Sequence, residues 1–223
     1  MFYAKKIVSI QPQDRVLEIG PGSTPHRRAD AFLELRFDSA QEQVAQRGGV
    51  TQAGHFAGRP VHYYDGGRFP FDDGQFDYVI CSHVIEHVNS PADFLQEIFR
   101  VGTGRGYLEY PMITYEYLYN FSVHLHFIKF DAERKILRYL PKRETGMASF
   151  SPVSALFNKT LVDGWDELCA ANHALFFEGF EYHQPFAIEK SADIEALCPP
   201  PSYVGPKKKI RKLVGQILNH TGL

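Results

Sequence analysis

The feature that most constrains this chain is a short apolar run that ends in an acidic residue and a Gly-Pro-Gly turn, from Val16 to Gly22. The apolar run is typical of a buried β-strand bounded by a turn. Glycine permits backbone conformations in which peptide N–H groups approach a ligand closely. The segment therefore predicts a strand that leads directly into a ligand-binding turn.

The next hundred residues continue as alternating strands and connections. A loop is expected over residues 20–30, and residues 39–60 are polar, dotted with glycine and expected to hold little regular structure. A helix is expected over Pro91–Val101, with Ser90 as its cap and Pro91 in its first turn. This alternation predicts an α/β fold built on a mostly parallel sheet flanked by helices. Strands are expected over residues 15–19, 31–37, 61–64, 76–82 and 107–110.

Beyond residue 112 the pattern changes to a C-terminal α+β extension or cap. Residues 123–128 alternate like a strand, and residues 163–177 place apolar side chains on one helical face. A proline-rich linker over residues 198–206 precedes a basic amphipathic helix at 207–218. We expect a ligand-binding core at residues 1–112, the rest of the domain with a cap at 113–198, and the linker and terminal helix at 199–223.

Composition narrows the class of protein. The 223 residues are 44% hydrophobic and carry a net charge of −2, which does not favour nucleic acid as a partner. The three cysteines are far apart and imply neither a disulfide framework nor a zinc site. With no secretory leader at residues 1–10 and no apolar run of membrane-spanning length, the expected location is the cytoplasm.

The residues around the turn restrict the ligand. A dinucleotide-binding loop follows the pattern G-x-G-x-x-G, but Pro25 stands where the third glycine is needed. A carboxylate at Glu18 would also repel a diphosphate. A ligand that carries a cationic group suits the site better, which weighs against a nucleotide-dependent oxidoreductase.

Taken in order, the motifs resemble the class I S-adenosylmethionine-dependent methyltransferases, specifically the methyltransferase type 11 group. The resemblance covers about residues 14–112 and implies a Rossmann-like fold, S-adenosylmethionine as cofactor, and a small-molecule or sugar acceptor. The motifs that carry it are VLEIGPG at residues 16–22, Asp65 with FPF at 69–71, FDYV at 76–79, VIEHV at 84–88, and EIFRV at 97–101 with Gly104 and Gly106.

The resemblance also implies roles for individual residues. Glu18, Gly20, Pro21 and Gly22 would meet the methionine part of the cofactor. An acidic residue at the end of the second strand would bind both ribose hydroxyls, and two compete. Glu34 is favoured, because a five-residue strand from Asp30 would end there, whereas Asp38 ends a longer strand. Asp65 and Gly66 would bind adenine, and Ser82 and His83 would lie beside the reacting methyl group.

Histidines are the candidates for removing a proton from the acceptor, since their charge changes near neutral pH. His83 is expected in the ligand crevice of the sheet, and His124 is expected to share one strand face with His126. No third ligand at a fixed spacing from these two is evident, so no metal site is expected. Glu86 and His87 are interpreted as structural residues.

Alternatives remain at this point. A methyltransferase fold without activity would serve as a binding or regulatory protein, and the irregular loops at residues 20–30 and 48–58 motivate that interpretation. The basic helix at 207–218 could contact an anionic membrane surface peripherally, or it could pack on its own domain or on a second subunit in a homodimer. The expected acceptor remains a small molecule or a sugar unit, such as part of a cell-surface polysaccharide.

Overall fold

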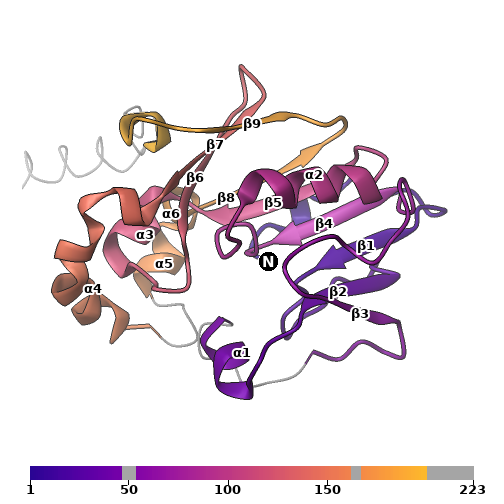
Figure 1. Ribbon diagram of the computed structural model, residues 1–223, viewed down its shortest axis with the longest axis horizontal. Coiled ribbons are helices and arrows are strands. Elements are labelled where there is room, and N and C mark those ends of the chain that lie inside the picture. The colour runs from indigo at the N-terminus through magenta and orange to yellow at the C-terminus, as the bar shows by residue number, and fades with distance from the viewer. Residues whose placement is uncertain (47–53, 162–166, 200–223) are drawn as a thin grey trace, which may run out of the picture.

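A six-stranded sheet forms the centre of the protein. The computed structural model describes residues 1–46, 54–161 and 167–199. The strand order is β3-β2-β1-β4-β5-β8, in which the first five strands are parallel and β8 is antiparallel to β5 (Figure 1). This confirms the predicted Rossmann-like, mostly parallel α/β sheet. The strands are β1 Val16–Ile19, β2 Ala31–Leu35, β3 Val61–Tyr64, β4 Tyr78–Ser82, β5 Gly106–Pro111 and β8 Phe177–Tyr182.

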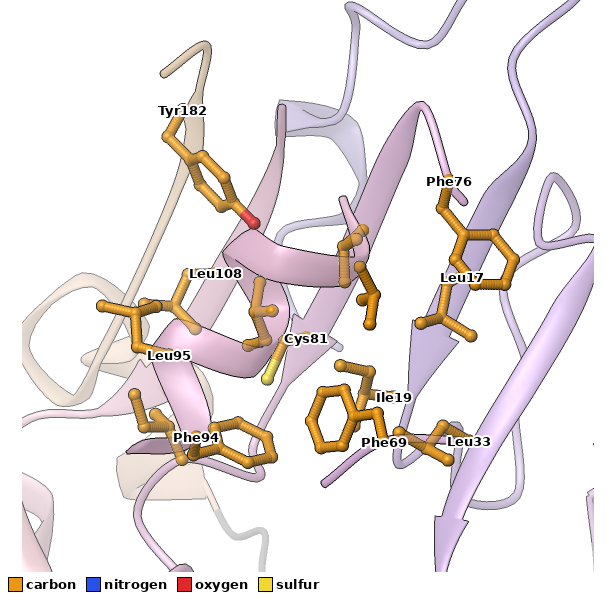
Figure 2. Packing of buried hydrophobic residues seen from close by; sticks show 14 of the residues in the cluster. Leu17, Ile19, Leu33, Phe69, Phe76, Cys81, Phe94, Leu95, Leu108 and Tyr182 are labelled. Atoms are coloured by element: carbon orange, nitrogen blue, oxygen red, sulfur yellow. The ribbon is translucent and has the colours of Figure 1, made fainter. Parts of the chain in front are cut away.

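Helix α2, Pro91–Val101, has the bounds that the sequence predicts. The Ser90 side chain accepts a hydrogen bond from the Asp93 backbone N–H, and Pro91 occupies the first turn, where no N–H is required. Phe94 and Leu95 are among the apolar side chains that α2 buries on one face of the sheet, against Leu108 and Cys81 (Figure 2). This packing forms the main hydrophobic core.

The opposite face of the sheet is covered by the N-terminal arm, residues 1–10. The arm contains a short 3₁₀ turn, η1 Ala4–Lys6. Apolar side chains of the arm pack on residues whose side chains alternate to this face, because successive strand residues point to opposite sides. The sheet residues are Val16, Tyr78, Ile80 and Tyr107, and the arm residues are Met1, Tyr3, Ile7 and Ile10.

The connection from β1 to β2 is a loop without a helix, as predicted. The Arg59 guanidinium donates hydrogen bonds to the carbonyls of His26 and Ala29 and so ties the loop to the segment before β3. The expectation of little regular structure over residues 39–60 is wrong at its start, since Ala40–Gln46 forms helix α1. Ser39 Oγ accepts from the Glu42 N–H, as a helix cap does. Residues 47–53 lie outside the described residues.

A second, three-stranded sheet has the order β6-β7-β9. Its strands are β6 His126–Asp131, β7 Ile136–Pro141 and β9 Ala187–Lys190. The predicted strand at 123–128 is therefore shifted, and His124 lies before it. The remaining elements are α3 Ile113–Tyr119, η2 Lys142–Glu144, η3 Gly146–Phe150, α4 Ser151–Asn158, α5 Glu167–Ala171, α6 His173–Phe176 and η4 Glu195–Leu197.

The single helix expected over residues 163–177 is wrong in its C-terminal part, because α5 and α6 are separate helices that meet at Asn172 and β8 begins at Phe177. Residues 163–166 lie outside the described residues, as do most of the linker and the whole helix expected at 207–218. Within residues 1–46, 54–161 and 167–199, no helix is long and apolar enough to cross a membrane.

Candidate functional site

A cavity of about 460 Å³ opens at the carboxyl ends of the parallel strands, which is where open α/β sheets bind ligands. The volume of this cavity lies in the range of small-molecule and cofactor sites. Seven of the site residues that the sequence predicts line the cavity. The seven are Gly20, Gly22, Glu34, Asp38, Asp65, Gly66 and His83.

Gly20 shapes the floor of this cavity. Its φ of +61° lies in the left-handed region that side chains rarely adopt, and a Cβ at this position would overlap Val84 Cγ2. The Gly20 N–H donates to the Leu33 carbonyl, which holds the turn against β2. Only glycine therefore fits this turn as it stands, and the open side of the turn exposes backbone to the cavity.

Both candidate ribose-binding acids line the cavity, in different surroundings. Glu34 lies within β2, one residue before its end, and is 6% exposed. Asp38 is exposed and follows the strand, where its backbone N–H donates to Glu42 Oε2. The strand ends at Leu35, close to the end expected for the shorter interpretation.

Asp65 and Gly66 lie directly after β3 at the same edge of the sheet. The Asp65 carboxylate is 3.6 Å from the Arg36 guanidinium, and its side chain is 75% exposed. Gly66 has a φ of +87°, which turns the chain away from the strand. The carboxylate and the neighbouring backbone are thus accessible to a ligand.

Glu18, Pro21 and Ser82 are not among the described residues that line this cavity. Glu18 shares the sheet face of Val16 and is 3% exposed, and its Oε2 accepts a hydrogen bond of 2.7 Å from the His26 N–H. Burial raises the pKa of Glu18 to about 7. In the structure, Glu18 thus holds the loop that follows the glycine turn.

His83 is held between two buried carboxylates. Its Nε2 lies 2.9 Å from Glu109 Oε1 on β5, and its Nδ1 lies 3.5 Å from Glu86 Oε1. Burial by itself would lower the pKa of His83, but the hydrogen bond to Glu109 and the contact with Glu86 raise it overall. A backbone φ of +56° at His83 aims the ring into this position at the end of β4.

Glu109 is the centre of a hydrogen-bond network that sequence reasoning missed. Besides His83, it accepts from the hydroxyls of Ser82 and Tyr107 and from the backbone N–H groups of Phe2 and Tyr3. Burial opposes its ionisation, but these donors, His83 foremost, lower its pKa well below the usual range. The N-terminal arm therefore helps to fix the histidine at the cavity.

His124 lies apart from His83, beside a second cavity of about 410 Å³. Its Nδ1 is hydrogen-bonded to Glu116, a fully buried carboxylate that also receives Lys142 Nζ at 2.8 Å. Asn89 lines both cavities, so the two adjoin.

The expectation that His124 and His126 alternate on one strand face is wrong, because β6 begins only at His126. His126 Nε2 bonds to the Val88 carbonyl, whereas His124 reaches Glu116 from the preceding loop. The side chains that do approach His124 are Glu86 and His87 from the loop after β4, which the sequence interpretation treated as structural. His87 and His124 are 37 positions apart in the sequence, so no short motif of fixed spacing indicates that they lie close together.

The fold and the site are similar to those of the class I S-adenosylmethionine-dependent methyltransferases. Residues 17–109 match the family model described as a methyltransferase domain. S-adenosylmethionine is the cofactor of such domains. The cavity volume, the open turn at Gly20 and the carboxylates at the strand ends fit a molecule with amino and ribose groups.

Several solved structures are similar over part of their length. An S-adenosylmethionine-dependent methyltransferase from Thermotoga maritima is 22% identical, with a TM-score of 0.38 over 53% of this chain and 57% of that one. One from Mesorhizobium loti is 17% identical, with a TM-score of 0.33 over 48% and 50%. One from Methanosarcina mazei is 20% identical, with a TM-score of 0.33 over 56% and 69%. The chain thus spans about half the length of the first two, and no curated protein matches it.

Proposed function

We propose that this chain transfers a methyl group from S-adenosylmethionine to a small polar acceptor, such as a sugar unit. The observation that carries the proposal is the cavity at the strand ends, where the glycine turn and the acids of β2 and β3 converge within the matched segment. In this proposal residues 1–112 bind the cofactor and residues 113–198 form the acceptor side.

The bound cofactor supplies a methyl group on a positively charged sulfur. The protein therefore has to position the acceptor in line with that methyl group and to exclude water. Backbone at Gly20 and Gly22 would accommodate the methionine part, while Glu18 holds the loop behind them. Glu34 would accept hydrogen bonds from the ribose hydroxyls, with Asp38 as the alternative. Asp65 and Gly66 would meet the adenine edge.

The two catalytic candidates occupy different positions. His83 lines the cofactor cavity, but both its ring nitrogens face carboxylates, which supports a role in positioning and in charge balance. His124 lines the second cavity, and the bond from its Nδ1 to Glu116 leaves Nε2 available. Such a histidine–carboxylate pair is suited to accept a proton from an acceptor hydroxyl.

The second cavity supports a polar acceptor. Asn120, Ser122 and Arg143 line it together with His124, and these groups offer donors and acceptors to hydroxyls. Because the cavity adjoins the cofactor site through Asn89, an acceptor held there would face the methyl donor.

Calorimetry with S-adenosylmethionine, S-adenosylhomocysteine and NAD tests the first step. Micromolar binding of the first two without NAD is expected, whereas NAD binding would favour an oxidoreductase and overturn the proposal. Release of S-adenosylhomocysteine with a panel of sugars and sugar nucleotides tests turnover. Cofactor binding without turnover on any acceptor would favour the inactive binding protein.

Substitution separates the two histidines. His83→Asn keeps a residue that tolerates the left-handed backbone, and His124→Gln removes the imidazole beside the second cavity. Turnover and cofactor affinity should be measured separately for each variant. Unchanged turnover in both would remove the histidines from the mechanism.

A further inference from the structure

The Glu86 carboxylate is buried and makes no hydrogen bond to the part of the chain that the structure describes. Its side chain is 0% exposed, and neither oxygen has a hydrogen-bond partner among the described residues. His83 Nδ1 lies 3.5 Å from its Oε1, and His87 Nε2 lies 3.9 Å from the same oxygen. A buried carboxylate in this state is costly unless a positive charge compensates it.

Two histidines present nitrogen atoms to the same place. His87 Nδ1 lies 2.8 Å from Gln46 Oε1, and His124 Nδ1 is hydrogen-bonded to Glu116. Both partners are acceptors, so each Nδ1 carries the proton and each Nε2 keeps a free lone pair. Metal-binding histidines are oriented in this way, by an acceptor on the other ring nitrogen.

The three residues are close enough to share one ion. One ligand atom from each of Glu86, His87 and His124 lies within 4.8 Å of the other two, and the two rings meet edge to face at 4.6 Å. Bonds of about 2.0–2.2 Å would draw these atoms nearer by small side-chain rotations. Two imidazoles and one carboxylate are a donor set for first-row divalent metals.

The charge around this cluster also favours a cation. Glu86, Glu109 and Glu116 are all fully buried. His83 lies between Glu86 and Glu109, and His124 contacts Glu116 and lies near Glu86. Glu109 and Glu116 are satisfied by their own donors, including Lys142 for Glu116. Glu86 is the carboxylate of this group that has no hydrogen-bond donor among the described residues.

We propose that Glu86, His87 and His124 bind one divalent first-row transition-metal ion, with Gln46 and Glu116 orienting the two histidines. His87 lines the cofactor cavity and His124 lines the second cavity, so the ion would lie where the two adjoin. Three protein ligands leave coordination positions open, as in catalytic rather than structural metal sites. The site goes beyond the proposed function and gives His124 the role of ligand in place of proton acceptor.

Metal binding by the full, untagged chain tests the proposal without cofactor or acceptor. After treatment with a chelator, equilibrium dialysis against Zn²⁺ or Mn²⁺ should give one ion per chain. Glu86→Gln, His87→Gln and His124→Gln should each weaken binding by about 100-fold or more, because each removes a direct ligand. His62→Gln, on β3 and packed on Phe71 outside the cluster, is the matched control and should bind as the wild type.

X-ray absorption of the Zn²⁺-loaded wild type provides a measurement that does not depend on any variant folding. Two imidazole ligands are expected in its spectrum. The proposal is overturned by a wild type that binds no ion, by variants that bind as tightly as the wild type, or by a spectrum with fewer than two imidazoles. None of these results bears on S-adenosylmethionine binding, which calorimetry measures separately.

Discussion

His83 Nε2, directly after β4, and Glu109 Oε1, on the neighbouring β5, are 2.9 Å apart, and the Glu109 side chain is fully buried. The pair joins the cofactor cavity to the face of the sheet that the N-terminal arm covers. The histidine is therefore positioned by Glu109 at the end of the matched segment, by Glu86 within it, and through Glu109 by the arm before it.

Glu109→Gln should destabilise the protein by about 3 kcal/mol, because it places an amide among donors and removes the nearer of the two buried carboxylates that face His83. Urea unfolding at pH 7 measures the change. The control is Glu189→Gln, which removes an exposed partner 2.7 Å from Arg138 Nε and should cost under about 1 kcal/mol. Equal effects of the two variants would contradict the central place of Glu109.

Glu18→Gln should remove a pH dependence of stability. Because burial raises the pKa of Glu18 from 4.5 to about 7, the folded protein keeps a proton that the unfolded chain loses between these values. The contribution of Glu18 is thus fully present below pH 4.5 and is lost as the pH rises through 7, by about 3 kcal/mol in total. Unfolding of both proteins at pH 5 and pH 8 tests this. The free energy of unfolding of the wild type relative to that of Glu18→Gln should be lower at pH 8 than at pH 5. A difference that is the same at both pH values would refute the pKa shift.

Gly20→Ala should lower the free energy of unfolding by about 2–3 kcal/mol and weaken cofactor binding, since it combines a left-handed backbone with an overlap on Val84. The double variant Gly20→Ala/Val84→Ala should recover the part due to overlap only. Gly146→Ala is the control, because an added Cβ there meets no described atom within 4 Å. Full recovery in the double variant would show that the backbone conformation is not limiting.

Glu34→Gln should weaken S-adenosylmethionine binding by about 10- to 100-fold, because the ribose hydroxyls of the ligand lose a charged hydrogen-bond acceptor. Asp38→Asn, at an exposed position after the strand, should change the affinity by less than about threefold. Calorimetry on both variants decides between the two acids. The opposite ranking would assign the ribose to Asp38.

Local patterns in the sequence were sufficient for much of the fold. Helix α2 follows from Ser90, Pro91 and the apolar spacing, and β3 from a short run before Asp65. Helix α1 is not predicted, although Ser39 and Glu42 form a helix-cap pattern, because the glycines that follow it favour irregular structure. Asn172 separates α5 from α6, and α6 contacts α3, a long-range neighbour that local spacing does not reveal.

Some residues of the candidate site can likewise be predicted from local sequence patterns, and others cannot. Gly20, Glu34 and Asp65 are found from the sequence because each follows or ends a strand that local pattern reveals. Glu109 and Glu116 look like ordinary strand and helix residues, and apart from Tyr107 their side-chain partners lie 8 to 107 positions away. Burial of a carboxylate by distant segments leaves no periodic trace.

The long segment between β5 and β8 enters and leaves the sheet at a single rung. Pro111 pairs with Phe177, and the Met112 N–H donates to the Phe176 carbonyl at 2.7 Å. Residues 112–176 are consequently joined to the register of the six-stranded sheet at one rung, although Ile128 and Leu137 within them pack into its main core. Under the proposed division of roles, acceptor preference and cofactor binding would thereby be inherited as separate segments of this chain.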